Sequence, residues 1–142
     1  MTIAAILKDK GGRVISVAPG TSVREAVALL AGERIGAVPV LDGEEVVGIF
    51  SERDVIGCIH AGGGGALDGP VSAAMTAPVV SVSPGQPVIG ALSLMTQRRF
   101  RHLPVVQDGR LIGFISIGDL VKYRIDRIEA DAAAMRDYIQ SA

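Results

Sequence analysis

The chain has 142 residues, of which 49% are hydrophobic and 20% charged, and its formal net charge is −1. This balance excludes a disordered chain, and the lack of a basic excess argues against a protein built to grip a nucleic-acid backbone. A single cysteine, Cys58, excludes an intramolecular disulfide and fits a reducing compartment. Because no uncharged apolar run reaches about 18 residues, we expect a cytoplasmic protein without a membrane span.

The first half of the chain predicts a short series of helices and strands. Residues 1–8 predict a short amphipathic helix and not a signal peptide, because no basic segment leads a long apolar run. A short strand is expected at residues 13–17, and Thr21 or Ser22, with Glu25 three residues after Ser22, marks the start of a helix. Two apolar runs, 37–41 and 46–50, flank an Asp-Gly pair and predict a β-hairpin, in which Pro39 indicates an edge strand or a bulge. A second helix is expected from Ser51.

A glycine-rich stretch follows at residues 60–69. It contains four consecutive glycines, but no lysine and no serine or threonine after them, so it does not form a phosphate-binding P-loop. We interpret it as a flexible connector.

The second half repeats the first at an offset of 65 residues without a gap. Identical residues include Pro39 and Pro104, Gly48 and Gly113, Ser51 and Ser116, and Asp54 and Asp119. The repeat predicts a strand at 79–82, a helix with Pro87 at its first position, a hairpin from 102–106 and 111–115, and a helix from Ser116. The chain is therefore predicted to be a duplicated strand-helix-strand-strand-helix unit. A duplicated core without a functional site is the alternative.

Each copy closes with the motif Gly-x-x-Ser-x-x-Asp, at Gly48 to Asp54 and at Gly113 to Asp119. With the tandem order of elements, this motif resembles the CBS (cystathionine-β-synthase-type) domain family, over roughly residues 3–122. The resemblance implies an α+β fold of two β-α-β-β-α repeats packed with pseudo-twofold symmetry. The implied parts are a first repeat with the N-terminal helix at 1–60, a linker at 61–69, a second repeat at 70–125 and a helical extension at 126–142.

The resemblance also implies two clefts that bind adenosine derivatives such as AMP, ADP, ATP, S-adenosylmethionine or NAD. A serine at the end of a strand can cap the next helix, whose N-terminus attracts phosphate. The aspartate three residues later can accept hydrogen bonds from two ribose hydroxyls. The same pattern is also an ordinary helix start, in which the acid stabilises the helix dipole.

The two copies differ where this family binds phosphate. Gly36 and Ala37 in the first copy correspond to Arg101 and His102 in the second, which follow Arg98 and Arg99. Arginine suits bidentate phosphate binding, although a solvated basic turn is the alternative. Family geometry implies one site formed by Ser51, Arg53, Asp54, Gln86, Arg101 and His102, and another formed by Ser116, Asp119, Thr21, Ala26, Gly36 and Ala37. We expect the first site to bind a phosphorylated ligand more tightly.

No catalytic or metal-binding set is evident. The only histidines are His60 and His102, neither has an evident acidic partner, and Cys58 with His60 supplies too few ligands for zinc. We therefore expect a regulatory module that senses an adenine nucleotide, with no catalytic residue and no required cofactor. The alternative is a structural or interaction protein with empty clefts. A homodimer and an effector protein are the expected protein partners.

The C-terminal residues predict a helix from about 117 to 138. Apolar residues recur at alternating steps of four and three, which is a heptad seam: Val121, Ile125, Ile128, Ala132, Met135 and Ile139. The seam could pack on its own domain, or it could contact a second tail or another protein.

Overall fold

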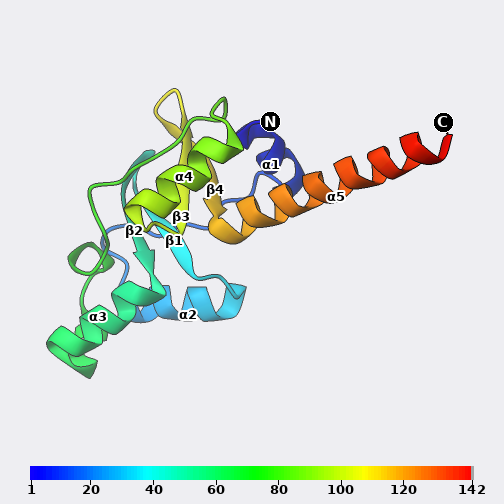
Figure 1. Cartoon of the computed structure of the whole chain (residues 1–142). Coiled ribbons are helices and arrows are strands. Elements are labelled where there is room, and N and C mark those ends of the chain that lie inside the picture. Colours follow the sequence, from blue (N-terminus) through cyan, green and yellow to red (C-terminus); the bar gives the residue numbers. More distant parts are fainter. Residues whose placement is uncertain (142) are drawn as a thin grey trace.

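The computed structural model describes residues 1–141 and shows an α+β protein built from two copies of one unit (Figure 1). The elements are α1 (Ile3–Lys10), α2 (Val23–Glu33), β1 (Ala37–Asp42), β2 (Glu45–Ser51), α3 (Glu52–Gly62), the 3-10 helices η1 (Gly64–Asp68) and η2 (Val71–Ala73), α4 (Val88–Arg98), β3 (His102–Gln107), β4 (Arg110–Ser116) and α5 (Ile117–Ser141). The predicted tandem α+β fold is confirmed.

The 65-residue repeat extends to the boundaries of the elements. The helices α2 and α4 begin at Val23 and Val88, which are 65 residues apart. Each hairpin is antiparallel, and its register shifts directly after the residue that follows the proline, between Val40 and Leu41 and at the equivalent place in β3. This confirms the predicted irregularity, which follows from the missing N–H of proline. Helix α4 starts one residue later than predicted, because Pro87 is its N-cap.

The strands predicted at 13–17 and 79–82 are wrong as extended strands. Each is reduced to one parallel bridge, from Val17 to Val40 and from Val82 to Val105. Val17 donates to the carbonyl of Pro39 (3.2 Å) and accepts from the N–H of Leu41 (2.8 Å). Because the chain then turns to begin the next helix, it stays beside the hairpin too briefly to form a third strand.

The segments that precede the two copies are exchanged between them. The N–H of Ile3 donates to Gln86 of the second copy (2.9 Å), and the N–H of Val71 donates to Thr21 of the first copy (2.8 Å). Ile3 is fully buried in the core of the second copy, and Val71 is fully buried in the core of the first. The N-terminal helix, which precedes the first copy in the chain, therefore stabilises the second.

The exchanged segments account for the glycine of each Gly-x-x-Ser-x-x-Asp motif. A Cβ atom on Gly48 would collide with the side chain of Met75, and one on Gly113 would collide with the side chain of Leu7. These glycines are needed for close packing between the copies.

The glycine-rich stretch is helical where we predicted a flexible connector. Helix α3 continues to Gly62, η1 follows from Gly64, and Leu67 packs against the core of the first copy. The anchor that Leu67 provides, together with helical hydrogen bonds, gives this segment a defined path in spite of its glycines.

Helix α5 extends away from the rest of the protein (Figure 1). It begins at Ile117 as predicted and continues to Ser141, and Leu120 is its only buried residue among those described. The seam therefore does not pack on its own domain beyond the base of the helix. Within residues 1–141, no helix is long and apolar enough to cross a membrane.

Candidate ligand-binding cleft

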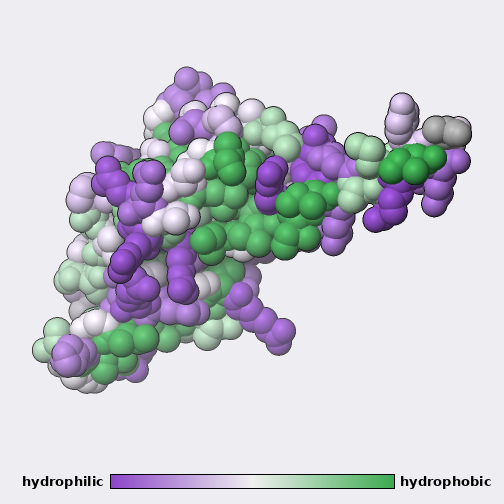
Figure 2. All heavy atoms as spheres, viewed as in Figure 1, coloured by the Kyte–Doolittle hydropathy of each residue, from purple (hydrophilic) through white to green (hydrophobic). Residues whose placement is uncertain are grey.

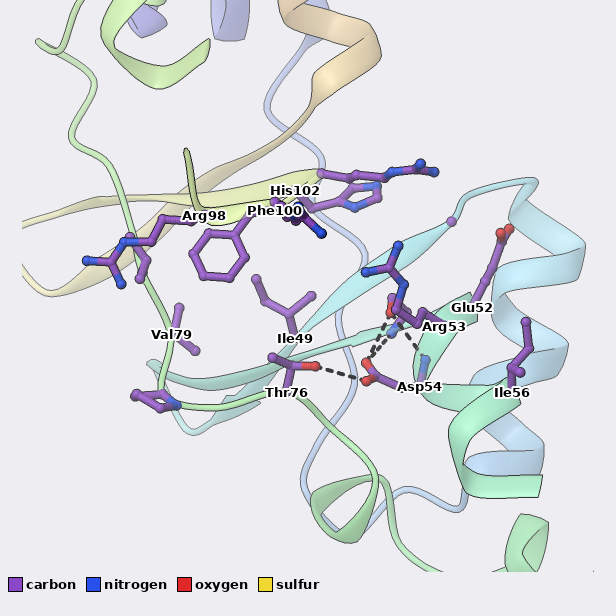
Figure 3. A pocket seen from close by; sticks show the side chains of 16 residues that line it. Ile49, Glu52, Arg53, Asp54, Ile56, Thr76, Val79, Arg98, Phe100 and His102 are labelled. Atoms are coloured by element: carbon purple, nitrogen blue, oxygen red, sulfur yellow. Dashed lines mark hydrogen bonds between the residues drawn. The ribbon is translucent and has the colours of Figure 1, made fainter. Parts of the chain in front are cut away.

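A cleft of about 500 Å³ opens between the two copies, beside the N-terminus of α3 (Figure 3). This volume lies in the range of small-molecule sites. The cleft is lined by Gly36, Ile49, Ser51, Glu52, Arg53, Asp54, Ile56, Thr76, Pro78, Val79, Val80, Arg98, Arg99, Phe100, Arg101 and His102. The structure thus brings together Ser51, Arg53, Asp54, Arg101 and His102 from the predicted first site.

Asp54 is held in a fixed orientation at the start of α3. One carboxylate oxygen accepts from the backbone N–H of Ser51 (2.9 Å) and from its hydroxyl (3.1 Å), and the other accepts from the hydroxyl of Thr76 (2.9 Å). Ser51 in turn caps the helix by accepting from the N–H of Asp54 (3.4 Å). Its described partners are all neutral, and the carboxylate oxygens have lone pairs left to accept further hydrogen bonds from a ligand.

One end of the cleft has an apolar wall, and Arg98 lies at the same end (Figure 3). Ile49 of β2, Val79 and Phe100 lie close to one another there, whereas Asp54 and Arg53 lie nearer its middle (Figure 3). A flat heterocycle could pack against such a surface, with polar groups of the same ligand reaching Asp54.

The polar lining carries an excess of positive charge. Four arginines (Arg53, Arg98, Arg99 and Arg101) line the cleft, against two acidic residues, Glu52 and Asp54. None of these arginines forms a salt bridge within the part of the chain that the structure describes. Unpaired guanidinium groups in one cleft favour an anionic ligand.

His102 lies at the edge of the cleft, where its ring stacks on Phe114 with 5.5 Å between ring centroids and 11° between planes. Burial lowers the pKa of His102 below its ordinary value, and the charge of Lys10 lowers it further. The imidazole is therefore neutral near pH 7, and it offers one donor without adding to the positive charge.

The corresponding position in the second copy has a different partner. Asp119 caps α5 with Ser116 as Asp54 caps α3, but it also accepts from the ammonium of Lys10 (2.7 Å). Lys10 donates in addition to the carbonyl of Phe114 (2.6 Å). Burial alone would raise the pKa of Asp119, but hydrogen bonds from Lys10 and Ser116 lower it below its ordinary value. The ammonium of Lys10 thus forms an ion pair with this carboxylate.

The other residues of the predicted second site have different surroundings. Ala26 and Ala37 are buried, Gly36 lines the cleft beside Asp54, and Thr21 lies in a separate hollow with Ser16 and Glu25. Gln86, expected in the first site, does not line that cleft, because its side-chain oxygen accepts from the N–H of Ser83 (2.8 Å). Thr21 makes the equivalent bond to Ala18 (3.2 Å). Gln86 and Thr21 each close a turn.

Several lining residues were missed from the sequence. Thr76 belongs to the segment between the repeats, whereas Val79 and Val80 lie in the stretch predicted as a strand at 79–82. Arg98 and Arg99 were visible as a basic pair. Arg99 adopts φ 57° at the end of α4, as Arg34 does (φ 56°) at the end of α2. This left-handed turn ends the helix and leads the chain into β3.

Over the described residues, no three His, Cys, Asp or Glu side chains come close enough to hold a metal ion. Cys58 is half-buried, and its thiol lies 3.7 Å from the carbonyl oxygen of Ala66.

Comparison with known proteins gives consistent matches. The family model described as CBS domain matches residues 10–61 and 71–126. The CBS domain-containing protein YhcV of Bacillus subtilis is 32% identical over 123 residues, which cover 85% of this chain and 86% of that protein. A CBS-domain containing protein of Agrobacterium tumefaciens has a crystal structure with a TM-score of 0.84 and 42% identity, over 87% of this chain and 99% of that one. CBSX2, solved in complex with AMP, has a TM-score of 0.75 and 27% identity, over 88% of this chain and 96% of that one.

Proposed function

Since the chain belongs to the CBS domain family, we propose that it is a regulatory module that binds an adenine nucleotide in the cleft beside Asp54. The observation that carries this proposal is the combination, in one cleft, of an oriented carboxylate, an apolar wall and unpaired arginines. The complex of the similar protein CBSX2 with AMP supports it.

In the proposed binding mode, the adenine packs among Ile49, Val79 and Phe100 at the apolar end. The ribose hydroxyls donate to Asp54, whose carboxylate Thr76 and Ser51 hold in place. The phosphates lie toward Arg53 and Arg101, near the N-terminus of α3, where the helix dipole favours an anion. The neutral His102 donates one hydrogen bond.

We propose that binding regulates another protein and that the chain catalyses no reaction itself. The polar groups beside Asp54 are suited to holding a ligand, since the hydroxyls of Ser51 and Thr76 fix the orientation of the carboxylate. We also propose a homodimer, an effector protein as the downstream partner and a cytoplasmic location.

Thermal unfolding with a panel of ligands tests the proposal. The panel contains AMP, ADP, ATP, S-adenosylmethionine, NAD and GMP. A ligand at 100 times its Kd should stabilise the protein by about 2.7 kcal/mol. We expect the adenine nucleotides to stabilise more than GMP does. If no compound raises the melting temperature, the proposal fails and an interaction protein with empty clefts is favoured.

A matched pair of variants locates the site. Arg101→Ala should weaken AMP binding in calorimetry by roughly 10- to 100-fold, the effect of one hydrogen bond between charged groups. Arg127→Ala, which removes an arginine from α5 outside the cleft, should leave the affinity unchanged. Equal affinities for the two variants would contradict the assignment of Arg101.

A further inference from the structure

The heptad seam of α5 is a continuous apolar surface with no partner in the described chain. Five of its residues are 44% to 65% exposed, namely Val121, Ile125, Ile128, Met135 and Ile139, and Ala132 between them is also exposed. Figure 2 shows hydrophobic side chains along α5, continuing to its base. From Val121 to Ile139 the seam is about 27 Å long at 1.5 Å per residue. A surface of this kind is typical of a site that another protein element covers.

The charges of α5 argue against a membrane as that partner. The helix carries four basic residues and five acidic residues (Lys122, Arg124, Arg127 and Arg136; Asp119, Asp126, Glu129, Asp131 and Asp137). A helix that lies on an anionic membrane is usually rich in lysine and arginine on its polar face. The mixed charges instead suit pairing with a protein helix.

The residues beside the seam are complementary to a second copy of the same helix. With Ile125, Ala132 and Ile139 at heptad position a, the flanking g positions hold Arg124, Asp131 and Tyr138, and the e positions hold Lys122, Glu129 and Arg136. In a parallel, in-register pair, each g residue faces the e residue five positions later on the partner. Arg124 then faces Glu129 of the partner, and Asp131 faces Arg136 of the partner. By symmetry this gives four attractive contacts.

The antiparallel arrangement that uses the same six seam residues is disfavoured. It pairs e with e and g with g, so Lys122 would face Arg136 of the partner, Glu129 would face Glu129, and Asp131 would face Asp131. These three pairs have like charges, which destabilise the contact, and the remaining g pair, Arg124 with Tyr138, adds no attraction between opposite charges. We propose that α5 associates with α5 of a second copy as a parallel, in-register coiled coil, and that this contact is an interface of the homodimer.

Disulfide formation at the end of α5 tests the parallel arrangement of the two helices directly. In a Cys58→Ser background, Ile139→Cys places one thiol per chain at an a position. In the parallel pair the two thiols meet, whereas in the antiparallel pair they are at opposite ends of the seam. With diamide as oxidant, we expect rapid dimer formation on a non-reducing gel. Gln140→Cys, one residue further on the outer face, is the matched control and should react several-fold more slowly.

Two outcomes would overturn the proposal. One is equal rates for Ile139→Cys and Gln140→Cys in protein whose circular dichroism is unchanged. The other is a disulfide between Val121→Cys and Ile139→Cys chains in a mixture of the two, since only the antiparallel pair brings those positions together. A mass of 14.7 kDa, that of one chain, in sedimentation at micromolar concentration would also exclude the interface.

Charge reversal gives an independent check with the same readout. In the Ile139→Cys protein, Glu129→Arg should slow the disulfide reaction roughly tenfold, because Arg124 would then face an arginine. Adding Arg124→Glu should restore the rate, because the pair is attractive again. An unchanged rate in Glu129→Arg, or no recovery in the double variant, contradicts the parallel register. Ile128→Asp should abolish the reaction, and Ala130→Asp on the opposite face should not.

Discussion

The two copies of the repeat have the same framework but different surroundings at the equivalent aspartates. Asp54 and Asp119 each cap a helix with a serine three residues earlier. Thr76, a neutral hydroxyl, approaches Asp54, whereas Lys10, a cation, approaches Asp119. The residues that differ come from the exchanged segments, outside the repeated unit. The two copies thus share a scaffold, and the exchanged segment determines whether a neutral hydroxyl or a cation contacts each carboxylate.

The largest loss of stability should come from weakening the core contacts of the two exchanged segments. Ile3→Ala should reduce the free energy of unfolding by about 2–5 kcal/mol, because Ile3 is fully buried in the core of the second copy. Val71→Ala should cost somewhat less, because fewer methyl groups are removed from the core of the first copy. Urea unfolding measures both, with Lys8→Ala on the exposed side of α1 as the control. A loss for Ile3→Ala no larger than that of the control would show that α1 is not part of the core.

The next largest effect should be a difference in AMP affinity between variants of the two aspartates. Asp54→Ala should weaken AMP binding at least tenfold, about 1.4 kcal/mol, because the ribose hydroxyls lose a charged acceptor. Asp119→Ala is its matched control, since it removes the same helix cap and should leave AMP affinity unchanged. Calorimetry measures both. Equal losses in the two variants would mean that the capping role, and not contact with the ligand, explains the result.

A smaller effect should follow from removing the cation beside Asp119. Lys10→Met removes an ion pair whose side chains are 40% and 29% exposed, so the loss of stability should be only about 0.2–1 kcal/mol. We expect one AMP per wild-type chain, since Lys10 occupies the second carboxylate. Binding of two nucleotides to the wild type in calorimetry would contradict this difference between the copies.

The smallest effect should be a pH dependence from His102. Burial lowers its pKa in the folded protein, so between that pKa and about 6.5 the unfolded chain binds more protons than the native one. The contribution of the neutral His102 to the free energy of unfolding should therefore be fully present above pH 6.5. It should decrease as the pH falls from there through the pKa of His102 in the folded protein. Urea unfolding at pH 7.5 and 5.5 measures this. His102→Phe keeps an aromatic ring against Phe114, and it should lose less stability on acidification than the wild type does. An equal loss in both proteins would exclude His102 as the cause.

Much of the fold could be predicted from the sequence because its signals are local and occur twice. The serines that cap α2 and α3, the hairpin turns and the irregularity near each proline all depend on residues within a few positions. The strands at 13–17 and 79–82 were predicted wrongly, since a short apolar run does not reveal how many residues stay beside a hairpin. The helical path of the glycine-rich stretch depends on Leu67, whose contact with the core is not local.

The candidate site was predictable only in part, for the same reason. Ser51, Asp54, Arg101 and His102 belong to the repeat and its asymmetry, and all line the cleft. The sequence by itself determined the two units, their helix caps and the heptad seam of α5, because these depend on spacing along the chain. Only the tertiary structure decided that α1 stabilises the second copy, that Thr76 reaches Asp54 and that Lys10 reaches Asp119. Lys10 and Asp119 are 109 positions apart in the chain, and no periodicity links them.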